Sequence, residues 1–282
     1  MRSKLLVTAA IAASLLTTGV AAQTPPEWRT VAPENLLVID TSKGRIVVEL
    51  DPRVAPRHVE RIRTLADRGF YDGLKFHRVV PGFMAQTGDP EGTGRGGSEL
   101  PDMPAEFQFR RGRDSGFQVV DAGQAVQMGV IGSMPVVTQP DAQMFVTADM
   151  KTGAQALFCP GVAGMARSGD NVNSANSQFF LMMEATEVLN GAYTPFGRVL
   201  QGMDVITSLN AGTEANNGEV ANPDIMTRAR TAAAMPEGQR PTARVMDTRS
   251  PAFAALVAQT RTARGAAFTI CDVQPTVEIT GG

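Results

Sequence analysis

The chain has 282 residues, of which 43% are hydrophobic and 19% are charged, and its formal net charge is −2. This composition is typical of a globular protein that can bury a substantial core. The slightly negative charge argues against nucleic-acid binding, which usually requires a basic face, so we expect no nucleic-acid partner.

Residues 1–22 are predicted to be a signal peptide for export. Arg2 and Lys4 give a short basic start, residues 5–20 are apolar, and small residues precede a cleavage site near Ala22. The apolar segment is shorter than the about 20 residues that a membrane span needs, and an uncleaved anchor is the second interpretation. We expect a bacterial, periplasmic protein that has no stable membrane span after cleavage.

A main domain is predicted at residues 36–235, after a polar, proline-containing segment at 23–35 that predicts a flexible leader. The domain begins with two strands, at 36–40 and 45–50. Gly44 supplies the positive φ of the turn between them.

A helix is predicted to begin at Pro56, which suits a first helical turn, and to end at Gly69, a typical C-terminal cap. His58 lies in this helical pattern and is expected at the surface. The apolar stripe of the helix consists of Val59, Ile62, Leu65 and Ala66.

A strand is predicted at residues 75–80. Neighbouring residues of a strand point to opposite faces, so His77 and Arg78 are expected to point apart. His77 is interpreted as a structural, hydrogen-bonded histidine rather than a base. The chain has only two histidines, so few residues could serve as metal ligands or as the base of a Ser-His-Asp triad. A hydrolase is therefore disfavoured.

The glycine-rich segment 88–97 lacks the Lys-Ser/Thr ending of a phosphate-binding loop. It is predicted to be an irregular loop bordering a cleft. Residues 108–158 are interpreted as an insertion of a few short strands beside the main domain. Short apolar segments occur there at 117–120, 128–130 and 144–146. Further predicted elements are strands at 161–166, 177–183 and 196–200, and a helix that begins near Gly202.

Residues 236–282 are predicted to form a C-terminal extension packed on the domain. The extension contains a helix at 250–263, with Ser250 as N-cap, and a last strand at 273–279. A closing strand of the domain is expected at 224–231. Many strands and two helices in the main body indicate an antiparallel β architecture.

The chain has two cysteines, Cys159 and Cys271. In an exported protein, an isolated even pair predicts one disulfide, which here would join the end of the insertion to the tail. Two buried free thiols are the alternative interpretation.

Two clusters of residues carry the chemistry. The first, residues 76–89, places one cation, two apolar side chains and an amide around a Pro-Gly turn. The second is residues 176–180, in which Gln178 and Phe180 share one face of a strand. Single residues of these kinds are usually core or surface residues. Together they predict a half-apolar groove with a cation at its edge, which suits a proline ring and its flanking peptide groups.

In this order the two clusters resemble the cyclophilin family of peptidyl-prolyl isomerases over residues 36–210, interrupted by the insertion. The resemblance implies a mainly β fold: a closed eight-stranded antiparallel barrel with two capping helices. It implies an isomerase of X-Pro bonds that needs no cofactor and no metal. Its partners would be proline-containing peptides and unfolded exported proteins, and we expect a monomer. The alternative is a non-catalytic peptide-binding module or chaperone with the same groove.

The same resemblance assigns roles to individual residues. The catalytic set would be Arg78, Phe83 and Gln86. Substrate binding would involve Met84, Ala166, Arg167, Gln178, Phe180, Leu189 and Tyr193. Val188 stands where tight cyclosporin binders of the family have tryptophan, which predicts weak sensitivity to that drug.

Overall fold

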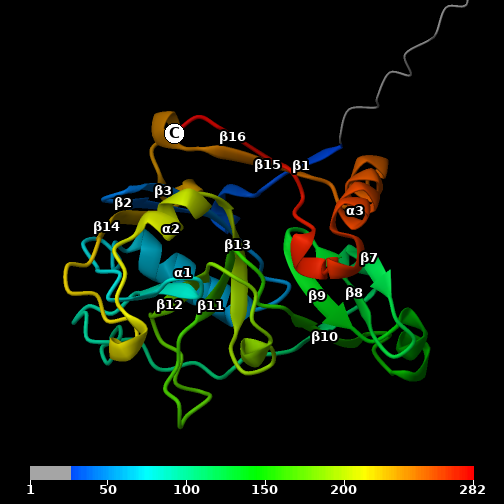
Figure 1. The fold of residues 1–282 in the computed structure, drawn as a ribbon, viewed down its shortest axis with the longest axis horizontal. Helices are drawn as coiled ribbons and strands as arrows, with labels where there is room; N and C mark the ends of the chain where they lie inside the picture. The colour runs from blue at the N-terminus through cyan, green and yellow to red at the C-terminus, as the bar shows by residue number, and fades with distance from the viewer. Residues whose placement is uncertain (1–26) are drawn as a thin grey trace, which may run out of the picture.

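The computed structural model describes residues 27–282. The predicted signal peptide and its cleavage site near Ala22 lie outside these residues. Figure 1 shows a lobe that contains α1, α2 and most of the long strands, and a second lobe formed by β7 to β10. The tail crosses from the first lobe to the second and returns. Within the described residues, no helix is both long and apolar enough to cross a bilayer.

The first lobe is built on an eight-stranded antiparallel sheet with the order β14-β2-β3-β13-β11-β12-β5-β4. Its strands are β2 (Leu36–Thr41), β3 (Gly44–Leu50), β4 (Arg78–Val80), β5 (Met84–Thr87), β11 (Val162–Met165), β12 (Phe179–Met182), β13 (Pro195–Gln201) and β14 (Met226–Thr231). The sheet curls, because main-chain bonds join the segments beside its two end strands: the Phe76 N–H donates to the Asp224 carbonyl at 2.9 Å. The predicted mainly β, antiparallel architecture is confirmed.

Two helices pack against this sheet, α1 (Pro56–Asp67) and α2 (Met203–Ser208). The predicted apolar stripe of α1 is buried. The prediction for His58 is wrong, because its side chain is fully buried. The His58 Nδ1 lies 2.7 Å from Oε2 of Glu106, and this carboxylate also accepts from the main-chain N–H groups of Arg57 and His58. A carboxylate at a helix N-terminus is electrostatically favoured, and this one draws the histidine inward.

The insertion contains short strands, as predicted, and these strands pair into a second sheet. Its order is β6-β10-β9-β8-β7. The strands are β6 (Phe109–Arg111), β7 (Phe117–Ala122), β8 (Gln127–Ile131), β9 (Met134–Thr138) and β10 (Thr152–Ala156). The apolar segment at 144–146 belongs to the 3-10 helix η3 (Asp141–Val146), in which Met144 is buried while Phe145 and Val146 are exposed.

The described part of the predicted leader, residues 27–35, is folded against the rest of the chain, so the prediction of a flexible leader is wrong there. Of residues 23–35, β1 (Trp28–Thr30) pairs with β15 (Thr242–Met246) of the tail, which in turn pairs with β16 (Val277–Thr280). Arg29 of β1 also donates from Nη2 to the Glu49 carboxylate at 2.8 Å. Pairing with a strand more than 200 residues away gave no local signal in the sequence.

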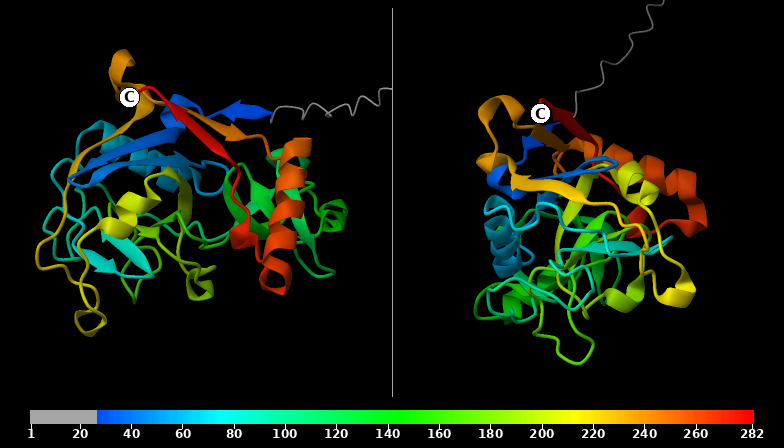
Figure 2. Two further views of the ribbon diagram at one scale, coloured as in Figure 1. Left: turned by 45° about the horizontal axis from the view of Figure 1, so that its top comes forward. Right: turned by 90° about the vertical axis from the view of Figure 1, so that its left-hand side faces the viewer.

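The rest of the tail packs against the insertion. Helix α3 (Pro251–Arg264) begins after Ser250, whose side chain accepts from the Phe253 N–H, as the predicted N-cap requires. Phe253 lies in one buried cluster with Val120 and Val130 of the insertion, and Figure 2 shows α3 beside the insertion strands. A disulfide joins Cys159 to Cys271, so the tail is covalently attached to the end of the insertion.

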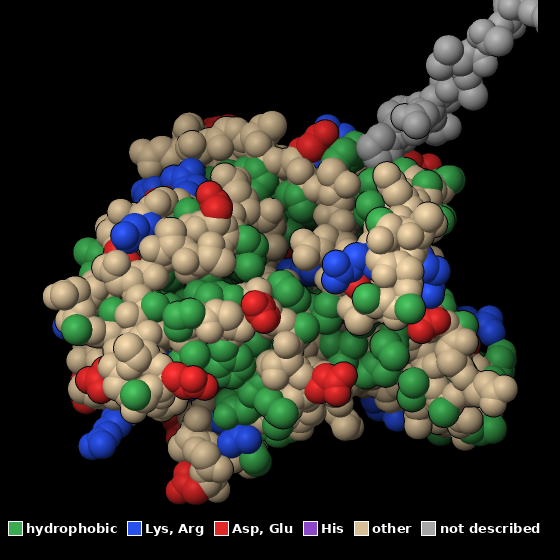
Figure 3. All heavy atoms as spheres, viewed as in Figure 1, with side chains coloured by type: hydrophobic (Ala, Val, Ile, Leu, Met, Phe, Trp, Pro, Cys, Tyr) green, Lys and Arg blue, Asp and Glu red, His purple; other side chains and the backbone are tan. Residues whose placement is uncertain are grey.

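The apolar interior consists of several clusters. The largest lies within the curled sheet and includes the rings of Tyr71, Phe76, Phe179 and Phe196. A second cluster joins the two lobes, since it combines Met84 and Phe180 of the first sheet with Ile131 and Val136 of the insertion. On the surface shown in Figure 3, positive and negative side chains are interspersed.

Candidate active site

Arg78 lies on β4 and is half-buried, and its guanidinium donates three hydrogen bonds to oxygen atoms. Its Nε donates to the main-chain oxygen of Asn217 at 2.8 Å, and Nη2 donates to Oδ1 of the same residue at 2.9 Å. Nη1 donates to Oε1 of Gln86 at 3.1 Å. Burial lowers the pKa of Arg78, but a guanidinium remains protonated under ordinary conditions. The site therefore holds a fixed positive charge.

Two amides continue this network across the sheet. Nε2 of Gln86 donates to Oε1 of Gln178 at 2.9 Å, and Nε2 of Gln178 donates to the carbonyl of Gly96 at 2.8 Å. The pairing of β5 with β12 places Gln86 opposite Phe180, which brings Gln178 to the same edge. Arg78 and both glutamines are thereby oriented before any ligand binds.

A cavity of about 170 Å³ opens beside the guanidinium. It is lined by Arg78, Phe83, Met84, Gln86, Ala166, Arg167, Phe180, Leu189 and Tyr193. Every predicted site residue except Gln178 is in this set. Gln178 lines an adjoining cavity of about 550 Å³, which shares Gln86, Ala166 and Arg167 with the first. The structure therefore brings the two distant sequence clusters into one cleft.

Part of the smaller cavity is lined by apolar and aromatic side chains, and the rest is lined by Arg78, Gln86 and Arg167. Met84, Phe180 and Leu189 are each less than 10% exposed. The Tyr193 ring meets Phe180 edge-on at a centroid distance of 5.8 Å, and the Arg167 guanidinium lies 4.6 Å from the Tyr193 ring centroid. The alternation predicted for β12 holds, because the neighbouring Phe179 packs in the core of the curled sheet instead. The cavity is thus a small, partly apolar slot bordered by the cations Arg78 and Arg167.

A third cavity also borders Arg78 and Gln86, and is lined in part by His77 and Asn217. His77 is buried, but neither of its ring nitrogens has a hydrogen-bond partner among the described residues. No hydrogen bond of good geometry to His77 is therefore present within residues 27–282, and its structural role stays a prediction. Desolvation lowers the pKa of His77, which favours the neutral ring, although a main-chain contact with Lys75 acts to raise that pKa.

The loop 88–97 is organised by one carboxylate, that of Asp89. This buried side chain accepts from the main-chain N–H groups of Glu91 and Thr93, both at 2.8 Å, and from that of Gly94. Burial alone would raise the pKa of Asp89, but these hydrogen bonds lower it. The loop is irregular and borders the cleft, as predicted. It also places the Gly96 carbonyl that holds Gln178.

Sequence reasoning missed two residues that support the site, Asn217 and Asp89. Asn217 has a left-handed backbone with φ of 55° and precedes Gly218. An Asn-Gly pair is a turn signal that could have indicated a specific conformation there. For Asp89, the available signal was an aspartate at the start of a glycine-rich loop, since Asp side chains bond nearby main-chain N–H groups.

The arrangement is suited to binding rather than to bond cleavage. The slot can take a small apolar ring, while Arg78, Gln86 and Gln178 offer donors and acceptors to the peptide groups beside it. Arg78 presents its guanidinium to the slot, where a developing lone pair on a bound ring nitrogen would gain a donor. Within the described residues the slot offers no serine, cysteine or threonine side chain that could act as a nucleophile.

Comparison with known proteins identifies similar chains. Residues 36–231 match the family profile described as cyclophilin type peptidyl-prolyl cis-trans isomerase/CLD. A probable peptidyl-prolyl cis-trans isomerase of Brucella suis is 36% identical over 208 residues, which cover 70% of this chain and 82% of the relative. A peptidyl-prolyl cis-trans isomerase-like 1 of Aspergillus oryzae is 37% identical over 184 residues, which cover 65% of this chain and 85% of the relative.

Among solved structures, cyclophilin AquaCyp293 from Hirschia baltica has a similar fold. The TM-score is 0.81 at 33% sequence identity, and the likeness covers 90% of this chain and 94% of that one. This share of the chain is larger than residues 36–231. The structural likeness therefore reaches beyond the segment that matches the family profile.

Proposed function

The chain belongs to the family of cyclophilin-type peptidyl-prolyl cis-trans isomerases, and from that membership we propose that it accelerates X-Pro isomerisation while exported proteins fold. The observation that carries the proposal is the placement of Arg78, whose guanidinium borders a partly apolar cavity of about 170 Å³. A proline ring is of a size to enter that cavity.

The barrier to be lowered arises from the partial double bond of the amide. Rotation costs roughly 18–20 kcal/mol, and uncatalysed X-Pro exchange takes about tens to hundreds of seconds. When the bond twists, conjugation is lost and the prolyl nitrogen becomes pyramidal and more basic. A donor aimed at that nitrogen binds the twisted form better than either planar isomer, which is the condition for catalysis.

Arg78 is the group proposed to supply this donor. Arginine remains charged and presents its N–H groups in a rigid fork, which Asn217 and Gln86 hold in place. An acceleration of ~10⁵ needs about 7 kcal/mol from this hydrogen bond, desolvation and ring fit together. No proton is transferred and no bond is broken.

The other site residues are proposed to bind and orient the peptide. Gln86 and Gln178 would bond its main chain. Ala166 and Arg167 would lie along the extended chain, because they line both the slot and the adjoining cavity. The ring of the substrate proline would contact Phe83, Met84, Phe180, Leu189 and Tyr193.

We further propose that the eight-stranded sheet closes fully into a barrel. Its support is the set of main-chain contacts between the two ends of the sheet, including the isolated bridges Lys75–Ile225 and Arg78–Glu219. Closure would hold Arg78 between β5, which pairs with β4, and the segment of Asn217 and Glu219 at the other end of the sheet.

We also propose that the protein is bacterial, acts as a monomer in the periplasm, and is released by cleavage near Ala22. The basic and apolar character of residues 1–22 supports export. A disulfide between Cys159 and Cys271 suits an oxidising compartment. Cell fractionation and the N-terminal sequence of the mature protein would test this part, and a cytoplasmic, uncleaved chain would contradict it.

The activity itself is tested with the mature protein and a peptide whose X-Pro bond is followed by NMR exchange. We expect cis-trans exchange to accelerate in proportion to enzyme concentration. We also expect faster refolding of an exported protein whose folding is limited by proline isomerisation. Binding of the peptide without any change in exchange rate would support the non-catalytic binding module instead.

A further inference from the structure

We propose that Phe158, at the end of the insertion, is a positioning residue for the proline cavity, and that the Cys159–Cys271 disulfide holds it there. This inference rests on the proposed function of the cavity. Phe158 does not line the cavity itself but contacts the elements that form two of its walls. The appended lobe and the tail would therefore set the dimensions of the slot.

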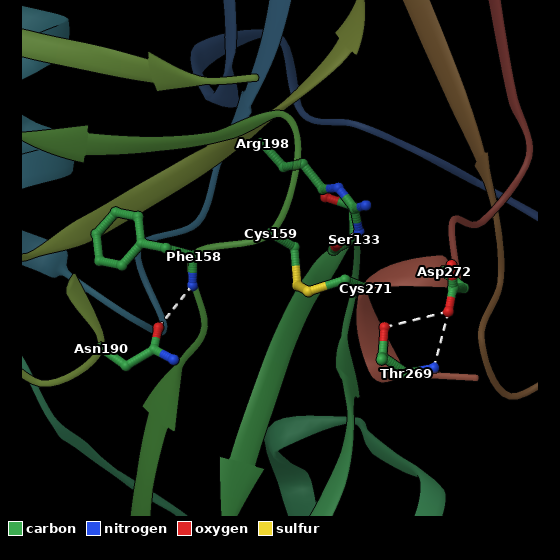
Figure 4. Close-up of a disulfide and its surroundings, with 8 residues drawn as sticks. All are labelled: Ser133, Phe158, Cys159, Asn190, Arg198, Thr269, Cys271 and Asp272. Carbon is green, nitrogen blue, oxygen red and sulfur yellow. Dashed lines mark hydrogen bonds between the residues drawn. A yellow bond between two sulfur atoms is a disulfide. The ribbon is translucent and has the colours of Figure 1, made fainter. Parts of the chain in front are cut away.

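The first wall is the segment that carries Leu189. The Phe158 N–H donates to Oδ1 of Asn190 at 2.8 Å, and the Phe158 carbonyl accepts from the Thr186 N–H at 3.0 Å. Thr186 and Asn190 flank the short 3-10 helix η4 (Glu187–Leu189) at its two ends. One residue of the insertion thus fixes both ends of the turn that presents Leu189 to the cavity. Figure 4 shows the contact with Asn190.

The second wall is the ring of Phe180. The Phe158 and Phe180 rings stack with centroids 5.6 Å apart and an interplanar angle of 29°. Both rings lie against Gly164 of β11, where a Cβ atom would come 2.5 Å from Cε1 of Phe158 and 2.7 Å from Cζ of Phe180. The absence of a side chain at Gly164 therefore lets Phe158 support the ring of Phe180 from behind.

Phe158 is itself anchored by its neighbours. The Leu157 N–H donates to the Pro135 carbonyl of β9 at 2.9 Å, and Cys159 is fully buried and bonded to Cys271. Cys271 lies on the 3-10 helix η9 (Ile270–Asp272), whose capping box is formed by Thr269 and Asp272. Figure 4 shows the disulfide, with Thr269 and Asp272 on the side of Cys271 and Phe158 next to Cys159. The tail therefore clamps the residue next to Phe158.

This arrangement predicts a change in ring-size preference when Phe158 is truncated. Loss of its ring removes the support behind Phe180, so the slot becomes wider and less complementary to a five-membered ring. The activity on a peptide with a six-membered ring, such as a pipecolate peptide, should therefore fall less than the activity on the proline peptide. A residue that affects only global stability would lower the activity on both peptides by the same factor.

The experiment compares kcat/KM on matched proline and pipecolate peptides, in full-length mature protein kept well below its Tm. For Phe158→Ala we expect kcat/KM on the proline peptide to fall about tenfold, equivalent to ~1.4 kcal/mol of transition-state stabilisation. The pipecolate-to-proline ratio should rise. Phe253→Ala is the matched control, because Phe253 is also buried but lies on α3 and packs against the insertion, away from the cavity. Its ratio should equal that of the wild type.

Two further variants test the same inference without changing Phe158 itself. Cys159→Ala/Cys271→Ala should shift the ratio in the same direction as Phe158→Ala. Asn190→Ala, which removes the acceptor of the Phe158 N–H, should do so too. If Phe158→Ala does not fold, Phe158→Leu carries the same prediction. An unchanged ratio in the folded variants would overturn the inference while leaving the isomerase intact. An inactive wild type would instead overturn the proposed function.

Discussion

Arg78 and Asn217 are joined by two hydrogen bonds, one to the main-chain oxygen at 2.8 Å and one to Oδ1 at 2.9 Å. Two bonds from one planar fork to one residue fix both the position and the plane of the guanidinium. Asn217 has a φ of 55°, a conformation that Asn adopts more readily than most residues. The backbone geometry of one turn therefore orients the charged group on β4.

Asn217→Gly should lower kcat by about three- to tenfold, a loss of roughly 0.7–1.4 kcal/mol. Glycine accepts the positive φ and keeps the main-chain bond, so the variant removes only the Oδ1 contact. Asn217→Asp retains an acceptor and should recover most of the activity. Kinetics on a proline peptide measure the effect. Full activity of Asn217→Gly would show that the Oδ1 contact does not matter for catalysis.

Asp89→Asn should destabilise the loop 88–97 in a pH-dependent manner. The pKa of Asp89 is lower in the folded protein than in the unfolded chain, so its stabilisation is fully present above the unfolded value of about 3.9. It is lost as the pH falls through the lower, folded pKa. The difference in free energy of unfolding between wild type and variant should be about 1–3 kcal/mol above pH ~5 and shrink below pH ~4. Urea titrations across this range would measure it, and a difference that grows on acidification would refute the assignment.

Removal of the disulfide should lower the free energy of unfolding by about 2–4 kcal/mol, because the bond closes a loop between residues 112 positions apart. Cys159→Ala/Cys271→Ala can be compared with the wild type by urea unfolding. Thiol titration of the denatured wild-type protein should find no free thiols. Two titratable thiols would mean that the bond is not formed in the isolated protein.

Cyclosporin should bind weakly. Val188 is 78% exposed beside the buried Leu189 and has no aromatic ring to cover the drug. Val188→Trp should therefore raise the affinity, whereas the isomerase activity should change little. Calorimetric titration of both proteins would test this, and tight binding by the wild type would show that other residues of the cleft suffice.

Local patterns predicted much of the first lobe and part of the tail. The turn at Gly44, the buried stripe of α1 and the N-cap Ser250 each depend on residues within a few positions of one another, and the structure contains all three. The cleft was also predictable, because six of its ten predicted residues occur in two compact clusters that resemble a known family, and the resemblance supplied the other four. Their catalytic roles remain predictions.

Features that depend on distant partners could not be read from the chain. His58 is buried because Glu106 reaches it from 48 positions away. Residues 28–30 form a strand only because β15 is beside them. The strand β10 (Thr152–Ala156) has the sequence TGAQA, with no apolar segment, and becomes a strand through pairing with β6 and β9. In each case tertiary pairing outweighed local preference.

The most direct test of the catalytic account is the rate of X-Pro exchange with Arg78→Ala, Arg78→Lys and wild type. Arg244→Ala serves as the control, because Arg244 is an exposed arginine on β15 that pairs with Glu278. We expect Arg78→Ala to lower kcat by about 100- to 1,000-fold, comparable to the loss of one transition-state donor. Arg78→Lys should be intermediate, since lysine keeps the charge but not the fork, and Arg244→Ala should match the wild type. Equal rates for Arg78→Ala and the wild type would contradict the account.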